Sequence, residues 1–367
     1  MYKNFLNRAK FRKSVIALSA LIFFASCEKL GYFPRPGDSK GDLGNLKQVN
    51  LVANNESYGA KRVDPLLLNA WGLAFGKTGL PWISSPGSGT TIIYDADGGP
   101  IFVPIHIPSP GGPTGGLATG QVAVDGPNFI LDNGVAASFI FVGLDGIISA
   151  WNPQMGTHAA VVKNNVGQAV YTGLALAVDK GGVNYLYAAN ALKGTVDVFD
   201  WAFRPVMDRP FIDPKLPAGY VPFNVHAVED YIFVTYSQVG PDGRALKQVG
   251  NGVVNVFTKQ GVLVRRFAEK GKLNAPWGVA AVPASFFAGE KAQPAILIGN
   301  FGDGKINAYS PEGKFISQLK VNNQVVSIDG LWEITLPPTK SILDQNRLYF
   351  TAGPADERDG LFGYLIK

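Results

Sequence analysis

This 367-residue chain contains few of the side chains that most often carry metal or nucleophilic chemistry. It has one cysteine, Cys27, and three histidines, at positions 106, 158 and 226. A single cysteine excludes a disulfide within the chain, so packing has to hold the fold together. One cysteine and widely separated histidines also exclude a zinc centre of the Cys/His type.

Charged residues are scarce as well, at 17% of the chain, and the net charge of +5 arises from the N-terminal segment. Segment 1–26 has no acidic residue, and its five basic residues account for the whole excess: Lys3, Arg8, Lys10, Arg12 and Lys13. The remainder is formally neutral and has no basic run that could follow a phosphate backbone. We therefore expect no nucleic-acid partner.

Glycine and proline are abundant instead, at 44 and 25 residues, and they accompany an internal repeat. In six places a glycine, or Asp359 in the last copy, precedes an aromatic residue by five positions. The aromatic residues are Tyr94, Trp151, Phe199, Phe257, Tyr309 and Tyr364. Their mean spacing of about 54 residues is typical of four-stranded propeller blades. The sequence therefore predicts an all-β fold, a six-bladed β-propeller.

Each copy also has an expected innermost strand that opens with a small or polar residue. These residues are Gly72, Gly120, Gly173, Asn224, Gly278 and Gly330. Small residues near the axis let neighbouring blades approach each other. Trp71 and Trp277 precede two of these glycines, and we expect them between blades or over the mouth of the channel. They serve there either as core packing or as ligand contacts.

The last blade lacks a fourth strand, because the sequence ends at Lys367. Segment 46–53 (LKQVNLVA) is strand-like and has no blade of its own. We expect it to join the sheet formed by residues 327–367, which closes the ring and removes two free sheet edges. The propeller domain is predicted to span residues 46–367.

The N-terminal region reads as an export signal. Residues 1–26 combine a basic start with an apolar run of about a dozen residues. Phe24-Ala25-Ser26 before Cys27 resembles the lipobox of bacterial lipoproteins, which implies acylation of that cysteine. Residues 27–45 are polar and rich in Gly and Pro, as expected of a flexible tether. We thus expect a lipid-anchored protein of the bacterial cell envelope, at the outer membrane or the cell surface.

Three stretches of the chain resemble a known family. They are Asp64–Phe75 (DPLLLNAWGLAF), residues 300–309 (NFGDGKINAY) and Phe350–Gly363 (FTAGPADERDGLFG). They are similar to an uncharacterised family of secreted bacterial propellers related to NHL-repeat proteins, and more distantly to streptogramin lyases and gluconolactonases. The resemblance covers roughly residues 46–367 and implies an exported six-bladed propeller. It implies no reaction, because the family has no established activity.

Propeller ligands bind where the loops of one face converge on the axial channel. The loops after the second strands offer oxygen-bearing side chains there: Asp145, Asn190, Asn300, Asp303, Asp356 and Glu357. Four of them, Asp145, Asn190, Asn300 and Asp303, form a hypothetical Ca²⁺ site, since hard cations take carboxylate and carbonyl oxygens. The same residue types are common turn formers. The predicted ligand-binding set is Asn190, Asn300, Asp303, Asp356, Glu357, Trp71 and Trp277.

His226 is the histidine expected in an innermost strand, where it is either a general base or a satisfied structural residue. No partner carboxylate can be assigned to it from the sequence. Two functions therefore stay open besides rigid spacing. One is a binding or scaffolding module for a glycan, peptide or envelope protein. The other is a cation-dependent hydrolase or lyase of small cyclic esters. Long loops at 108–118, 205–222 and 237–251 could serve either, or be tolerated surface length.

Overall fold

The computed structural model describes residues 43–287 and 293–367. The predicted signal segment 1–26, Cys27 and the tether up to residue 42 lie outside the described residues. Within the two described ranges, no helix is long and apolar enough to cross a membrane.

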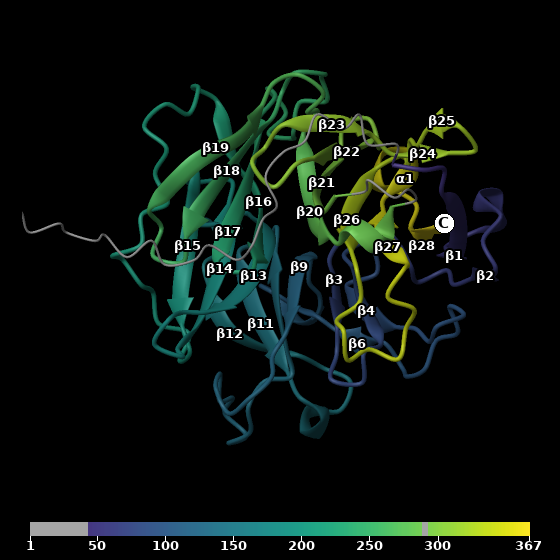
Figure 1. Ribbon diagram of the computed structural model, residues 1–367. Helices are drawn as coiled ribbons and strands as arrows, with labels where there is room; N and C mark the ends of the chain where they lie inside the picture. Colours follow the sequence, from purple (N-terminus) through teal and green to yellow (C-terminus); the bar gives the residue numbers. More distant parts are fainter. Residues whose placement is uncertain (1–42, 288–292) are drawn as a thin grey trace, which may run out of the picture. The chain divides into compact units, whose positions relative to one another are not determined.

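The described chain is nearly all β, and six sheets follow one another in chain order as the blades of a propeller (Figure 1). Blade 1 has β3 (Leu73–Phe75), β4 (Pro81–Ser85), β5 (Thr90–Ile93) and β6 (Ile105–His106). Blade 2 has β9 (Ala118–Ala123), β10 (Phe139–Gly143), β11 (Ile147–Trp151) and β12 (Ala160–Asn164). Blade 3 has β13 (Tyr171–Val178), β14 (Asn184–Asn190) and β15 (Thr195–Asp200).

The second half continues the pattern. Blade 4 has β16 (Tyr220–Val228), β17 (Tyr231–Gln238), β18 (Val253–Thr258) and β19 (Leu263–Glu269). Blade 5 has β20 (Pro276–Val282), β21 (Ala295–Asn300), β22 (Ile306–Tyr309) and β23 (Phe315–Gln318). Blade 6 has β26 (Leu331–Thr335), β27 (Leu348–Ala352), β28 (Leu361–Ile366), β1 (Lys47–Ala53) and β2 (Arg62–Val63). The predicted fold class, an all-β six-bladed propeller, is confirmed.

Short elements decorate the connections. Two ribbons pair β7 (Pro108–Ser109) with β8 (Gly112–Gly115) and β24 (Lys320–Val321) with β25 (Gln324–Val325). The long segment 108–118 therefore has a hairpin of its own. Helical turns occupy η1 (Glu56–Tyr58), η2 (Pro153–Met155), η3 (Ala284–Phe286) and α1 (Pro354–Glu357). In α1 the residues Ala355 and Asp356 have positive φ, so it is an irregular turn and not a regular helix.

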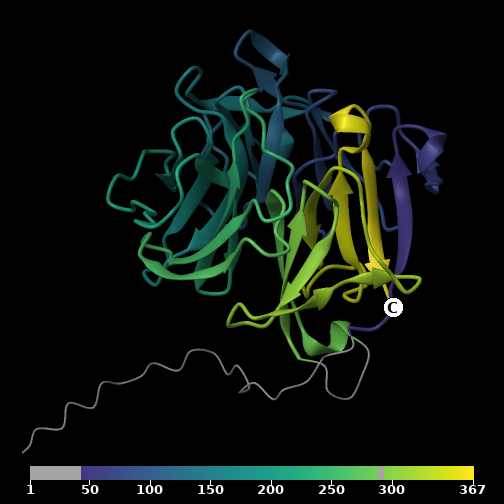
Figure 2. The ribbon, with the colours of Figure 1, turned by 90° about the horizontal axis from the view of Figure 1, so that it is seen from above.

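The N-terminal strand closes the ring, as the sequence predicts. β1 pairs antiparallel with β28, from Lys47 opposite Ile366 to Ala53 opposite Leu361. In Figure 2 the purple β1 lies beside the yellow C-terminal strands. Asp359 reinforces the junction, since its carboxylate accepts hydrogen bonds from Tyr58 Oη (2.6 Å) and Asn54 Nδ2 (2.8 Å).

The innermost glycines stand where neighbouring blades touch. A Cβ on Gly120 would overlap the backbone nitrogen of Leu174, and one on Gly173 would overlap the side chain of Asn224. Each glycine thus lets the next blade's innermost strand come into backbone contact. The repeat aromatics are all buried between blades; Tyr94, for example, packs with Tyr364 in one cluster. These contacts explain the period of the sequence pattern.

Candidate functional site

Aromatic side chains fill the axis at the ends where the innermost strands begin. The axial aromatic cluster consists of Trp71, Phe223, Ala275, Trp277, Phe301 and Trp332. Trp332 is its centre: it stacks on Trp71 with ring centroids 3.6 Å apart and on Phe301 at 4.0 Å. Because its members come from blades 1, 4, 5 and 6, the cluster crosses the axis and closes this end of the channel.

Hydrogen bonds between blades hold the cluster in place. The indole Nε1 of Trp277 donates to the Thr172 carbonyl on β13 (2.9 Å), and that of Trp332 donates to Asn69 Oδ1 (2.8 Å). The Thr351 hydroxyl donates to the Trp71 carbonyl. Buried tryptophans are stable when their N–H groups find such partners, so these contacts fix the rings from several blades.

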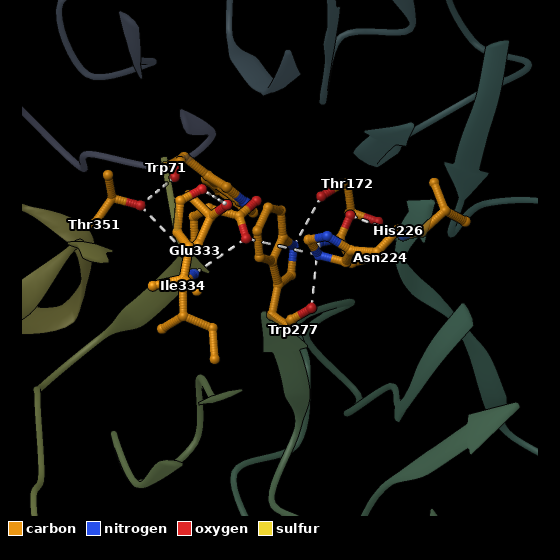
Figure 3. A network of polar contacts seen from close by, with 11 residues as sticks. Trp71, Thr172, Asn224, His226, Trp277, Glu333, Ile334 and Thr351 are labelled. Atoms are coloured by element: carbon orange, nitrogen blue, oxygen red, sulfur yellow. Dashed lines mark hydrogen bonds and ion pairs between the residues drawn. The ribbon is translucent and has the colours of Figure 1, made fainter. Parts of the chain in front are cut away.

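A carboxyl and an imidazole face each other next to this cluster. Glu333 on β26 places Oε1 3.8 Å from Nε2 of His226 on β16, and both side chains are mostly buried, with 10% and 16% exposed. The His226 ring meets the Trp277 ring edge-on at 5.8 Å. Figure 3 shows the two side chains approaching each other from separate strands beside Trp277. The structure thus supplies the partner carboxylate that the sequence left unassigned.

Local hydrogen bonds orient both members of the pair. Asn224 Nδ2 lies 2.7 Å from His226 Nε2. Because an amide nitrogen only donates, Nε2 accepts this bond and is the unprotonated nitrogen of a neutral ring. Glu333 Oε1 accepts the backbone N–H of Ile334 (3.0 Å), and the Glu333 N–H donates to Thr351 Oγ1 (3.1 Å). The innermost strands therefore aim both groups at the same point of the channel.

Burial shifts the two groups toward their neutral forms. It raises the pKa of Glu333 well above its ordinary value, although the Ile334 N–H opposes this in part. It lowers the pKa of His226 to about 4, with a smaller opposing contribution from the Trp277 backbone. Both shifts favour the neutral forms, a carboxylic acid that can give a proton and an imidazole that can take one.

Two buried polar atoms near the pair have no hydrogen-bond partner within the described ranges. They are Trp71 Nε1, an obligate donor, and Thr172 Oγ1, which donates or accepts. Both residues are drawn in Figure 3 around the His226–Glu333 pair. Unpaired buried groups are uncommon, and a bound water or ligand is one of the usual reasons.

The predicted calcium ligands are engaged in hydrogen bonds at the corners of three blades. Asn300 Nδ2 donates to Asp303 Oδ1 (3.0 Å) within blade 5, so the structure brings these two together. Asn190 Nδ2 donates to Asp197 (2.9 Å) in blade 3. Asp145 accepts the Ile147 N–H (3.1 Å) in blade 2. Across residues 43–287 and 293–367, three or more His, Cys, Asp or Glu side chains nowhere group as a metal site would require. Calcium binding stays a prediction.

The other predicted ligand residues divide into buried and exposed ones. Trp71 and Trp277 are 3% and 1% exposed, so their rings present almost no free surface. Asp356 is exposed, and it forms ion pairs with Arg244 and Lys247; Glu357 also pairs with Arg244. His106 and His158 stack on each other at 5.0 Å in the outer parts of blades 1 and 2, away from the innermost strands.

Glu333 is the residue that sequence reasoning missed. The strand sequence LWEIT carries a carboxyl in the middle of a buried apolar run. A charged residue is seldom fully buried without a reason, so this position was a usable signal. What the sequence could not supply is the alignment of blade 6 against blade 4 that brings Glu333 to His226.

Comparisons with known proteins place the chain by fold. No family model matches the sequence. Two uncharacterised proteins of Acanthamoeba polyphaga mimivirus are each 29% identical over 87% of this chain, covering 80% and 86% of their own lengths. These relatives are viral, so they give no support to the bacterial origin expected from the family resemblance.

Solved structures of similar fold are more distant in sequence. A protein of unknown function from Bacteroides thetaiotaomicron has a TM-score of 0.52 at 10% identity, covering 82% of this chain and 70% of that chain. A glucose dehydrogenase has a TM-score of 0.50 at 14% identity, covering 87% and 98%. A streptogramin B lyase has a TM-score of 0.48 at 10% identity, covering 87% and 97%. The likeness to the first two of these structures shows the propeller fold and leaves the activity open.

Proposed function

We propose that the protein carries out acid–base chemistry in its axial channel, as a hydrolase or lyase of a small, uncharged, oxygen-bearing substrate. The observation that carries the proposal is the His226–Glu333 pair, 3.8 Å apart and largely buried. Burying a carboxyl and an imidazole costs stability, and two hydrophobic side chains would fill the same space without that desolvation penalty. Opposite pKa shifts of two adjacent groups are typical of acid–base sites.

Each group has a definite role in this proposal. His226 Nε2 exchanges the hydrogen bond from Asn224 Nδ2 for the proton that leaves the substrate, or for the proton of an attacking water. Glu333 donates its proton to the oxygen of the bond that breaks. The imidazolium then returns a proton to the carboxylate across the short gap between them, which resets both groups. Elimination and ester hydrolysis both need these two transfers, and Trp71 Nε1 and Thr172 Oγ1 are free to hydrogen-bond substrate oxygens.

A panel of lactones and simple esters, beginning with glucono-1,5-lactone, tests this function. Glu333→Gln and His226→Gln should each lower turnover by about 100-fold or more, as expected for loss of a general acid or base. His106→Gln, on the outer strand of blade 1, is the matched control and should keep the wild-type rate. Equal rates in the wild type and both channel variants would refute the proposal. Chelation that abolishes turnover, with Asn300→Ala doing the same, would instead support the cation-dependent alternative.

The second candidate is a binding or scaffolding module without turnover. The axial aromatic cluster favours it, because packed rings close one end of the channel. Its ligand, a glycan, a peptide or an envelope protein, would then contact the loops of this face, where Asp356 is 65% exposed on its side chain. A glycan array read with the wild type, Asp356→Ala and Glu333→Gln separates the two candidates. A pure binder loses signal with Asp356→Ala and keeps it with Glu333→Gln.

Export and lipid attachment at Cys27 belong to the same proposal. They rest on the composition of residues 1–27, and they would place either function at a cell envelope. Expression in a bacterial host with an alkyne fatty acid checks this expectation. The wild type should be labelled and sediment with membranes, whereas Cys27→Ser should show neither property.

A further inference from the structure

We infer that residues 239–252, between β17 and β18, form a strap that an ionic latch holds closed over the axial aromatic cluster. The strap starts in blade 4, and its charged side chains reach the α1 turn of blade 6, which is not a neighbouring blade. A contact between these two blades has to pass over blade 5 or the axis. Because Ala245 and Lys247 of the strap contact the aromatic cluster, the strap lies over the end of the channel that the rings fill.

The latch consists of two basic side chains against two acidic ones. Arg244 pairs with Glu357 and lies 3.4 Å from Asp356. Lys247 Nζ lies 3.8 Å from the Asp356 carboxylate and 4.4 Å from the centre of the Phe301 ring. A cation over an aromatic face adds attraction to the ion pair. Ala245, between the two basic residues, packs against the aromatic cluster itself.

The latch is continuous with the buried tryptophans. Glu357 Oε2 accepts a hydrogen bond from Asn69 Nδ2 (3.2 Å), and Asn69 Oδ1 accepts one from Trp332 Nε1 (2.8 Å). Trp332 in turn stacks on Trp71 and Phe301. Because these contacts form one chain, the position of Arg244 is coupled to the packing of the cluster.

The strap is anchored at its C-terminal end, where Gly250 N–H donates to the Leu273 carbonyl (2.7 Å) and the Asn251 carbonyl accepts from Ala275 N–H (2.8 Å), so its tip is the part that can move. Its tip is a small turn closed by its own hydrogen bonds, Gly240 N–H to the Arg244 carbonyl (2.8 Å) and Leu246 N–H to the Gln238 carbonyl (2.8 Å). Without the latch this turn would open more often, so its amides would exchange faster. Half of the Arg244 side chain is exposed, so dissolved salt screens the pair. Lifting the strap would uncover Trp332 and Phe301 for a ligand approaching from this face.

The acidic half of the latch sits on strained backbone. Ala355, Asp356 and Glu357 have φ values of 55°, 58° and 67°, although none of them is glycine. Consecutive left-handed residues persist only where surrounding contacts hold them, and Arg244 supplies such a contact. The latch and the His226–Glu333 pair consist of different residues. The test of the latch follows the position of the strap and not turnover, so its outcome does not depend on the acid–base proposal.

Hydrogen exchange of the full chain tests the latch directly. Arg244→Gln and Glu357→Gln should each accelerate amide exchange over the strap tip, residues 240–247, by roughly fivefold, the effect of losing an ion pair of this exposure. Arg204→Gln is the matched control, because it breaks the exposed Arg204–Asp200 pair of blade 3. Raising salt from about 0.05 M to about 0.5 M should accelerate the same peptide in the wild type and barely in Arg244→Gln.

Tryptophan accessibility tests whether the strap covers the cluster. Trp201, which is 43% exposed, is first replaced by phenylalanine, which leaves five buried tryptophans of which three lie in the cluster. In that background Arg244→Gln should raise the acrylamide quenching constant about twofold, and Arg204→Gln should leave it unchanged. Unaltered exchange in both latch variants, an equal effect of Arg204→Gln, or unaltered quenching would overturn the inference.

Discussion

Glu333 Oε1 and His226 Nε2 lie 3.8 Å apart, although their strands belong to blades 6 and 4, which are not neighbours. The innermost strands of a six-bladed propeller converge on the axis, which lets side chains on strands of such blades meet. The closure of the ring therefore creates the pair. Its pKa shifts allow the pair to be tested without a known substrate.

Replacing Glu333 with Gln should change how stability depends on pH. The folded pKa of Glu333 lies well above its ordinary value of 4.5, so above pH 4.5 the folded state keeps a proton that the unfolded state has lost. Wild-type stability should therefore fall as pH rises through this window, by up to about 1.4 kcal/mol per pH unit. Glu333→Gln should not show this loss of stability, because glutamine does not titrate. Its melting temperature relative to the wild type should rise between pH 5 and pH 8, and a constant difference would contradict the shift.

His226 should contribute a slope of the opposite sign at lower pH. Its pKa is lowered from 6.5 to about 4, so between these values the unfolded state binds a proton that the folded state does not. Stability should therefore fall as pH drops from 6.5 to 4, by about 3 kcal/mol in total. Because Glu333 acts in the opposite direction from pH 4.5 upward, the clean measurement compares urea unfolding of Glu333→Gln with that of Glu333→Gln/His226→Gln. Parallel curves for the two proteins would exclude a buried neutral His226.

Gly173→Ala should be destabilising although it adds one methyl group. The new Cβ would overlap the Asn224 side chain, which in turn contacts His226. Overpacking of this kind costs about 1–3 kcal/mol. Gly112→Ala is the control, since nothing lies within 4 Å of a Cβ at that position. Chemical unfolding of the two variants should separate them clearly, and equal stability would mean that the blades can move apart at low cost.

The closing strand should contribute as much to stability as any strand of the core. Leu51 on β1 is completely buried and packs in the cluster that joins blades 1 and 6. Leu51→Ala should therefore cost about 2–5 kcal/mol. Leu66→Ala, at a position that is 46% exposed, should stay within about 0.5 kcal/mol of the wild type. If Leu51→Ala were equally mild, β1 would not be an integral strand of blade 6.

Parts of the fold and the site could be read from the sequence because they repeat. The six aromatic residues that stand five positions after a glycine, or after Asp359 in the last copy, indicated the number of blades, and the unpaired segment 46–53 indicated how the ring closes. His226 was placed in an innermost strand for the same reason. The loop sequences did not indicate which residues bind a ligand, because an asparagine such as Asn190 or Asn300 fits the sequence equally well as a ligand contact or as a turn-stabilising residue.

The sequence by itself determined the blade period and the places where glycine lets strands approach, because both follow from a regular spacing. It also determined the closing strand, because the repeat leaves segment 46–53 without a blade. Tertiary structure alone decided that Glu333 meets His226, that three tryptophans share one cluster, and that Arg244 reaches Glu357. Those contacts join blades that are far apart in sequence, and the angle at which the ring closes sets their distances. No local pattern records that angle.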